Sequence, residues 1–154
     1  MSEDVRAPKT TGHLDHLRRI VAGTAPAPAI ASLVGLTMTR IDPGQSVFEM
    51  DAGPQHANPM GTLHGGVICD LSDAAMGTAM ATTLEDDESF TTLDLTAKYF
   101  KPIWSARLRA TAQVVKRTRT LGLIECEVRD DSGSMVAKVF STCIALRGEK
   151  AVGR

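Results

Sequence analysis

The chain has 154 residues, of which 43% are hydrophobic, and its formal net charge is −1. This length and apolar content predict a single globular domain with a modest core. The near-neutral charge gives no indication of nucleic acid or an anionic membrane as a partner. No apolar run is long enough to span a bilayer, and the first residues lack a signal-peptide core. We therefore expect no membrane partner and a cytoplasmic location.

The three cysteines indicate the same compartment. Cys69, Cys126 and Cys143 are odd in number, widely spaced and embedded in apolar segments. Such cysteines are far more often buried reduced thiols than members of a disulfide or a metal site. We expect free thiols in a reducing environment.

The chain is predicted to form one domain with two short ends. Residues 1–12 are expected to be a disordered amino-terminal segment, and residues 147–154 a flexible tail. Residues 13–146 contain no linker, repeat or low-complexity block. We expect these residues to fold as a single unit.

The first half of this domain predicts a helix and then a hairpin. Apolar residues recur at helical spacing from His13 to Val21, as in an amphipathic helix. Pro26 and Pro28 then predict a loop. Leu33–Ile41 and Gln45–Asp51 are predicted to be the strands of a hairpin joined near Asp42-Pro43-Gly44, with Phe48 and Met50 on one face.

A long helix is predicted in the middle of the chain. It runs from about His64 to Leu84 through a segment rich in alanine and other small residues. The acidic run over 85–88 that follows is expected to be a solvated turn.

The second half predicts strands only. One is expected at Thr91–Phe100, before Pro102, and two more show alternating apolar and polar residues over 106–114 and 124–129. Met135–Leu146 is apolar on both faces, which is typical of a strand covered on both sides. Two strands, a helix and three or four further antiparallel strands predict an α+β fold, in which the sheet wraps the helix.

The most informative stretch joins a polar loop to the start of the central helix. Asn58 and His64 lie in the loop, and Gly65 and Gly66 open the helix. The first N–H groups of a helix have no intrahelical partner and lie at its positive end, so they suit a developing negative charge. Asp73 follows two to three turns later in an otherwise apolar helix. Oxyanion donors and one isolated carboxylate indicate acyl transfer without a serine nucleophile.

Four segments together resemble a known family. They are Asn58-x-x-Gly61-x-x-His64-Gly65-Gly66, Leu71-x-Asp73-x-Ala75-x-Gly77-x-Ala79, Asp94-Leu-Thr-Ala-Lys-Tyr99-Phe-Lys-Pro102 and Gly133-x-Met135-Val-Ala137. This combination is similar to the hot-dog-fold acyl-CoA thioesterases of the phenylacetate-pathway (PaaI-like) type. The resemblance covers residues 30–146 and implies a hot-dog fold, in which an antiparallel sheet wraps a long central helix.

The resemblance also implies catalytic roles. Asp73 would act as a general base on water or attack the thioester itself, and the sequence leaves both routes open. The Gly65 N–H would polarise the thioester carbonyl. Asn58 and His64 would position the carbonyl and the loop.

Further roles concern the water and the substrate. Thr92 would orient the water, although Thr91 next to it is an alternative. Gly66 and Gly77 would contact the substrate. Because several residues near Asp73 are small, the helix leaves room for an aryl-acetyl group or for a medium or long aliphatic chain.

A basic turn between two predicted strands is a candidate for binding coenzyme A. Arg117, Arg119 and Thr120 would contact the coenzyme A phosphates, and a solvated hairpin is an equally weighted alternative. We expect no cofactor beyond the coenzyme A that the substrate carries. We also expect no metal, because Asp70 and Asp73 lack histidine ligands at helical spacing.

The spacing of the site residues predicts a dimer. His64 and Asp73 are nine residues apart, so in an ideal helix they lie on opposite sides and about 13.5 Å apart along the axis. Two antiparallel helices related by a two-fold axis would bring His64 of one subunit toward Asp73 of the other. We expect a homodimer with shared sites, and the resemblance implies a tetramer of two dimers.

The favoured prediction is an enzyme that hydrolyses aryl-acetyl- or medium- to long-chain acyl-CoA to the free acid and coenzyme A. The main alternative is a non-catalytic hot-dog protein that binds acyl-CoA, which would not need Asp73. A hydratase of related fold is a second alternative, but its catalytic motif is arranged differently.

Overall fold

A computed structural model describes residues 12–153. Residues 1–11 of the segment that we expected to be disordered lie outside this range. The chain forms three α-helices, six strands and two short 3₁₀ turns within the described residues. They are α1 (Gly12–Val21), α2 (Ala29–Val34), β1 (Thr37–Asp42), β2 (Gln45–Ala52), a 3₁₀ turn (Pro54–His56), α3 (Gly65–Ala81), β3 (Glu88–Tyr99), β4 (Ala106–Arg117), β5 (Leu121–Arg129), β6 (Met135–Arg147) and a 3₁₀ turn (Gly148–Ala151).

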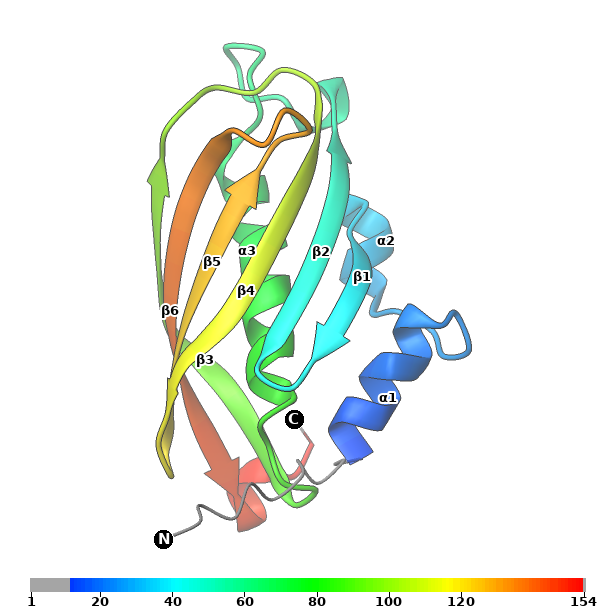
Figure 1. The fold of residues 1–154 in the computed structure, drawn as a ribbon, viewed down its shortest axis with the longest axis vertical. Coiled ribbons are helices and arrows are strands. Elements are labelled where there is room, and N and C mark those ends of the chain that lie inside the picture. Colours follow the sequence, from blue (N-terminus) through cyan, green and yellow to red (C-terminus); the bar gives the residue numbers. More distant parts are fainter. Residues whose placement is uncertain (1–11, 154) are drawn as a thin grey trace, which may run out of the picture.

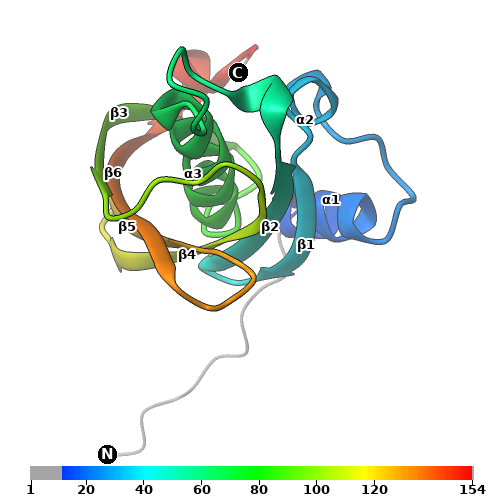
Figure 2. The same cartoon turned by 90° about the horizontal axis from the view of Figure 1, so that it is seen from above.

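The six strands form one antiparallel sheet that curls around α3 (Figures 1 and 2). The strand order is β1-β2-β4-β5-β6-β3, so β1 and β3 are the two edges. Leu71, Ala75, Met76 and Ala79 of α3 are completely buried against the inner faces of the strands. The predicted α+β fold, a sheet wrapped around one long apolar helix, is confirmed as the hot-dog fold.

The predicted hairpin is present as β1 and β2, but the helix α2 corrects the start of its first strand. We expected a strand over Leu33–Ile41, but Ala29–Val34 is helical and the strand β1 starts only at Thr37. A six-residue apolar run does not distinguish a buried helix from a strand by periodicity. The helix ends at Gly35, whose φ of 85° lies in the left-handed region that favours glycine.

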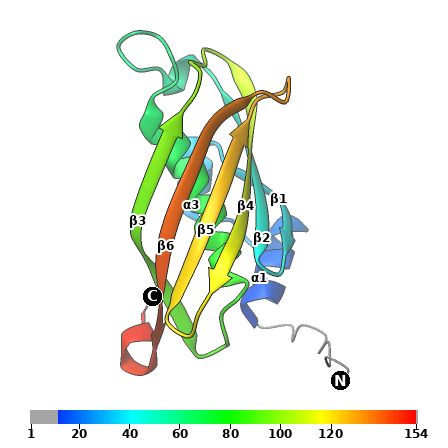
Figure 3. The ribbon, with the colours of Figure 1, turned by 60° about the vertical axis from the view of Figure 1, so that its left-hand side comes forward.

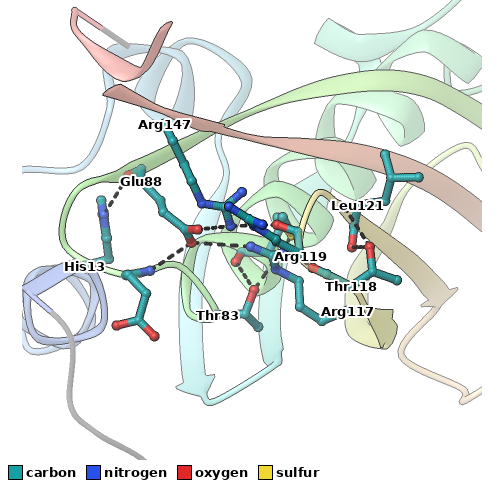
Figure 4. Close-up of polar contacts among 10 residues, drawn as sticks. His13, Thr83, Glu88, Arg117, Thr118, Arg119, Leu121 and Arg147 are labelled. Carbon is teal, nitrogen blue, oxygen red and sulfur yellow. Dashed lines mark hydrogen bonds and ion pairs between the residues drawn. The ribbon is translucent and has the colours of Figure 1, made fainter. Parts of the chain in front are cut away.

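The acidic run also differs from the prediction. Glu88 does not belong to a solvated turn, because it is the first residue of β3 and is buried. It is paired with Arg147 of β6 in the sheet, and its carboxylate forms ion pairs with Arg117 and Arg147 (Figure 4). The expected tail begins with Arg147 itself, the last residue of β6, and continues as the second 3₁₀ turn.

The edge strand β3 lies beside β6 (Figure 3) and contains a bulge at Leu93. There the pairing register with β6 shifts by one residue between Thr92 and Asp94. Leu93 is the extra residue, and its side chain is exposed. The bulge changes which residues face α3. These are Phe90 and Thr92 before the bulge, and Leu95, Ala97 and Tyr99 after it.

The helices α1 and α2 form an amino-terminal layer beside β1, on the side of α3 opposite β3 (Figure 2). Two hydrogen bonds connect the start of α1 to the residues around the start of β3. The Gly12 N–H donates to Asp86 Oδ1 at 2.6 Å, and His13 Nε2 hydrogen bonds with the Glu88 carbonyl at 3.1 Å. None of the helices in residues 12–153 is long and apolar enough to cross a bilayer.

Candidate active site

The start of α3 leaves one backbone donor free. His64 is the residue before the helix, and its Nδ1 accepts the Gly66 N–H at 2.9 Å. The Val67 N–H donates to the His64 carbonyl at 3.0 Å. Within residues 12–153 the Gly65 N–H has no acceptor, and it is the donor that the sequence predicted. Because His64 Nδ1 accepts a hydrogen bond, the ring carries its proton on Nε2.

Tyr99 fastens this first turn to the edge strand. Its hydroxyl donates to the Gly65 carbonyl at 3.0 Å and lies 3.2 Å from the Cys69 thiol. A Cβ atom on Gly65 would lie 3.1 Å from the Tyr99 ring, so only glycine fits without a shift. Burial and the hydrogen bond with Cys69 raise the pKa of Tyr99 to about 12, which keeps the hydroxyl protonated as a donor.

The sequence did not assign a role to Tyr99. The sequence shows that Tyr99 lies near the end of a predicted strand and close to Pro102. Its partner Gly65, however, is 34 residues away in the sequence. A contact of this kind depends on the packing of β3 against α3 and leaves no local pattern.

Asp73 lies in the third turn of α3 and faces β3. Thr92 Oγ1 donates to Asp73 Oδ1 at 3.4 Å. Of the two hydroxyls that the sequence left open, Thr92 rather than Thr91 is therefore within reach of the carboxylate. Neighbouring atoms partly bury the carboxylate and raise the pKa of Asp73 above its ordinary value of 3.8; the Thr92 hydrogen bond opposes this rise, and the charge of Asp70 adds to it.

Asn58 organises the loop before the helix. Its side-chain oxygen accepts the N–H groups of Met60 and Thr62, and its amide group donates to Thr62 Oγ1 at 2.8 Å. Gly61 has a φ of 84°, which closes this turn. The predicted role in positioning the loop fits this geometry, whereas a contact with the substrate carbonyl stays a prediction.

The predicted substrate contacts Gly66 and Gly77 both lie close to side chains of the same chain. A Cβ atom on Gly66 would lie 3.0 Å from His64 Nδ1, and one on Gly77 would lie 3.2 Å from the Phe90 ring. Glycine at these positions is explained by the helix cap and by the packing of α3 on β3. Their contact with substrate stays a prediction.

The basic turn between β4 and β5 is partly committed to internal contacts (Figure 4). Arg117 forms an ion pair with the buried Glu88 at 3.3 Å and donates to the Thr118 carbonyl. Arg147 donates to the Arg119 carbonyl at 2.6 Å, and the Ala145 N–H donates to the Thr120 carbonyl at 2.8 Å.

The Arg119 side chain is a cation that this turn leaves available, beside the exposed Lys116 at the end of β4. It is exposed, and its guanidinium has no carboxylate partner among residues 12–153. The structure thus separates the two arginines that the sequence treated together: Arg117 is held inside the protein, and Arg119 projects into solvent.

No group of three or more potential metal ligands occurs in the described part of the chain. Cys126 and Cys143 are buried free thiols, and Cys69 is a half-buried one. Burial raises the pKa of Cys126 to about 12 and also raises that of Cys143, so neither is a reactive thiolate.

Two cavities lie on opposite sides of α3. One of about 400 Å³ adjoins Gly65 and Tyr99 and includes Phe100 and Ile103. The other, of about 350 Å³, lies between α3 and the amino-terminal layer and includes Ala74 and Thr78. Both volumes fall within the range of small-molecule sites.

Known proteins of similar sequence and structure include esterases and thioesterases by name. A Caenorhabditis elegans protein, F42H10.6, whose name proposes an esterase, is 37% identical over 108 residues, 69% of this chain and 63% of the relative. The chain thus matches less than two thirds of that relative's length. Acyl-coenzyme A thioesterase 13 of Homo sapiens is 26% identical over 131 residues, 83% of this chain and 93% of the relative.

The solved structures include a phenylacetic acid degradation-related protein from Ralstonia eutropha JMP134. It is 29% identical, with a TM-score of 0.76 over 84% of this chain and 98% of that chain. A sequence model of the family described as "Thioesterase superfamily" matches residues 60–137, half of the chain. These residues hold the whole of α3 with Gly65 and Asp73, and also Thr92. The chain belongs to the thioesterase superfamily.

Proposed function

We propose that this protein is an acyl-CoA thioesterase that hydrolyses aryl-acetyl- or medium- to long-chain acyl-CoA. The observation that carries the proposal is the pair of unsatisfied groups on α3. The Gly65 N–H is free at the positive end of the helix, and the Asp73 carboxylate is held by one hydroxyl, that of Thr92. The human relative bears the name acyl-coenzyme A thioesterase, which supports coenzyme A as the leaving group.

The chemistry follows from these groups. The Gly65 N–H stabilises the negative charge on the thioester oxygen as the carbonyl carbon is attacked. Ionised Asp73 takes a proton from the attacking water, or it attacks the carbon itself to form an anhydride that water then cleaves. The carbon–sulfur bond breaks, the His64 Nε2–H can hydrogen bond to the departing thiolate, and the thiolate takes its proton from Asp73 or from solvent. The products are a carboxylic acid and coenzyme A.

Two subunits must share each site in this proposal. Gly65 and Asp73 are eight residues apart in one helix, or about 12 Å along its axis. An oxyanion donor and a base that act on one carbonyl must each lie within about 3 Å of it. We infer a homodimer in which antiparallel α3 helices bring Gly65 of one subunit to Asp73 of the other. No strand within residues 12–153 pairs with the outer side of the edge strand β3, so this edge is available for the contact.

Mixing inactive subunits tests the shared site. Heterodimers of His64→Ala and Asp73→Asn chains carry one intact site, so part of the activity returns when the two inactive proteins exchange subunits. Exchange is checked by native mass spectrometry. A mixture that exchanges fully and stays inactive would place both residues in the site of one subunit. The same measurement shows whether two dimers associate as a tetramer, which the resemblance implies.

The outer end of the substrate is proposed to meet the basic turn. Arg119 is an exposed cation there, and with Thr120 it is proposed to bind the phosphates of coenzyme A. Arg117 can add long-range attraction while it stays paired with Glu88. Coenzyme A belongs to the substrate, so no further cofactor is proposed. The three free thiols fit a cytoplasmic enzyme.

A hydrolysis screen tests the proposal directly. Purified protein is incubated with acyl-CoAs of graded length and aromaticity in the presence of EDTA, and released thiol is measured with a thiol reagent. We expect turnover without added metal. A protein that binds acyl-CoA with no release of coenzyme A would instead be the binding-only alternative.

A further inference from the structure

A tyrosine of the sheet holds the helix turn that carries the free backbone donor. The hydroxyl of Tyr99, the last residue of β3, donates to the Gly65 carbonyl at 3.0 Å. Two other hydrogen bonds fix the same turn, in which the N–H groups of Gly66 and Val67 donate to His64. Those two bonds join close neighbours in the sequence, whereas the bond from Tyr99 joins the turn to the sheet.

A glycine donor in the first turn of a helix needs such a restraint. Glycine has the widest range of backbone conformations, and helix ends fray. An oxyanion donor acts at full strength only when its N–H already points to the place where the negative charge develops. The Gly65 N–H and carbonyl belong to one residue, so a bond that holds the carbonyl also limits the rotation of the N–H.

The contact between Tyr99 and Gly65 is close and has a defined proton. A Cβ atom on Gly65 would lie 3.1 Å from the Tyr99 ring, so the ring covers one side of the glycine. The hydroxyl donates its one proton to the Gly65 carbonyl, so in the 3.2 Å contact with Cys69 the thiol is the donor. Because burial and this thiol raise the pKa of Tyr99 to about 12, the hydroxyl keeps its proton at neutral pH.

The strand that carries Tyr99 also supports the proposed base. Thr92, earlier in β3, donates to Asp73 Oδ1 at 3.4 Å. The strand is hydrogen bonded to β6 along its length, and side chains on a strand are held more precisely than those on a loop. Tyr99 therefore connects the oxyanion donor to the element that holds the carboxylate, which is also the edge where two subunits are proposed to meet.

We propose that Tyr99 is a positioning residue, whose hydroxyl holds the first turn of α3 so that the Gly65 N–H points at the thioester oxygen. This inference rests on the proposed thioesterase function. The hydroxyl does not give a proton to the substrate, because its one proton is bonded to the Gly65 carbonyl. Its contribution arises in the transition state, where the negative charge on the thioester oxygen is largest.

The first test is the effect of Tyr99→Phe on kcat and KM. The substitution removes the hydroxyl and keeps the ring, which lines the cavity next to Gly65. We expect kcat to fall about tenfold, less than the hundredfold or more that loss of an oxyanion donor costs, because the N–H is still present. KM should change less than about twofold, since the contacts made in the ground state are kept.

Thr96→Val is the matched control. It also removes one hydroxyl group from β3 and keeps the shape of the side chain. Thr96 is exposed and alternates with Leu95 and Ala97, which pack against the core. Its kcat and KM should equal those of the wild type.

A purely structural role of the hydroxyl predicts a different result. If the hydroxyl only stabilised the fold, Tyr99→Phe would lower Tm and leave kcat per folded molecule unchanged. The kinetics are therefore measured well below Tm, with the folded fraction determined by circular dichroism. A wild-type kcat in Tyr99→Phe under these conditions would overturn the inference.

Infrared spectroscopy of a bound thioester tests the geometry without turnover. An acyl-CoA with an isotope-labelled thioester carbonyl is bound to Asp73→Asn, which should not cleave it. A hydrogen bond from the Gly65 N–H lowers the stretching frequency of this carbonyl. Addition of Tyr99→Phe should move the band to higher frequency and broaden it, whereas addition of Thr96→Val should not. The same band in all three proteins would overturn the inference.

The two measurements together separate this inference from the proposed function. If the wild type releases coenzyme A, and Tyr99→Phe keeps the wild-type kcat and band, the inference fails and the proposed function stands. If the wild type releases no coenzyme A but the band moves in Tyr99→Phe, Tyr99 does position Gly65 against the bound carbonyl and the thioesterase proposal fails.

Discussion

Two polar regions beside the central helix differ in whether their polar groups have partners within the protein. Near the end of α3, Glu88 is buried and its carboxylate is paired with two arginines from β4 and β6. Along the open face of α3, Asp73 has one long hydrogen bond and the Gly65 N–H has none within the described chain. The first region has its charges satisfied from within. The second region has a donor and a carboxylate that are left available to interact with a substrate.

The contrast shows how to tell stabilising from functional polar residues in this fold. A buried charge with charged partners lowers the energy of the folded state only as long as every partner is present. A carboxylate whose pKa is raised by burial, and which has only one weak hydrogen-bond donor, destabilises the folded state when it is ionised. Such a group is suited to act as a base or a nucleophile. The predictions below test this division from the largest effect to the smallest.

The largest effect is expected on stability, at Glu88. Glu88→Gln leaves Arg117 and Arg147 without their carboxylate and should lower the free energy of unfolding by about 3 kcal/mol. Urea denaturation followed by circular dichroism measures it. Asp87→Asn is the control, because Asp87 is exposed and should change stability little. Equal effects of the two substitutions would mean that the ion pairs contribute no more than a surface charge.

The next effect is expected on catalysis, at Asp73. Asp73→Asn keeps the shape of the side chain but removes the base, so kcat should fall at least about a hundredfold. Asp70→Asn, one turn earlier on the same face, should have little effect on kcat. Steady-state kinetics of both variants decides the matter, and near wild-type turnover in Asp73→Asn would disprove the assignment.

A smaller effect is expected at the basic turn. Arg119→Ala should raise KM for acyl-CoA about fivefold, the most that an exposed ion pair usually contributes. It should leave KM for an acyl-pantetheine, which lacks the nucleotide, unchanged. Arg117→Ala should act differently and lower stability, because it leaves Glu88 with one partner. An equal rise of KM for both substrates in Arg119→Ala would show that the turn does not bind the nucleotide.

The smallest effect is a pH-dependent gain in stability from the loss of Asp73. The pKa of Asp73 is raised in the folded protein, so the ionised carboxylate opposes folding. Its favourable contribution is complete below its ordinary pKa of 3.8 and disappears as the pH rises through the higher folded-state pKa. Asp73→Asn should therefore have a slightly higher Tm at pH 7, and the gain should vanish in acid. Activity should show an acid limb above pH 3.8 for the same reason. Melting curves of both proteins across this pH range check it, and a Tm for Asp73→Asn at or below the wild type at pH 7 would contradict it.

The sequence was sufficient for the features that depend on local pattern. Alternation predicts β4 and β5, small apolar residues predict α3, and the glycine pair marks its first turn. Because these signals lie within one element, each can be read without knowledge of the fold. The order of elements then leaves a sheet around a helix as the economical way to bury both.

Features that depend on distant partners were missed. The acidic run looked like a solvated turn, since nothing near Glu88 reveals that arginines 29 and 59 residues further along the chain will meet it. The helix α2 was missed for a different reason, because six apolar residues carry too little periodicity. The contact between Tyr99 and Gly65 likewise appears only when β3 packs on α3.

The bulge in β3 has a consequence for the two site residues at its ends. Residues that face α3 have even numbers up to Thr92 and odd numbers from Leu95 to Tyr99. In a regular strand, residues separated by an odd number of positions point to opposite faces. If β3 paired regularly with β6 through Leu93, one half of the strand would therefore turn over. Either the Thr92 hydroxyl would leave Asp73, or the Tyr99 hydroxyl would leave the first turn of α3. The extra residue thus allows the partner of the base and the anchor of the oxyanion donor to face the same helix.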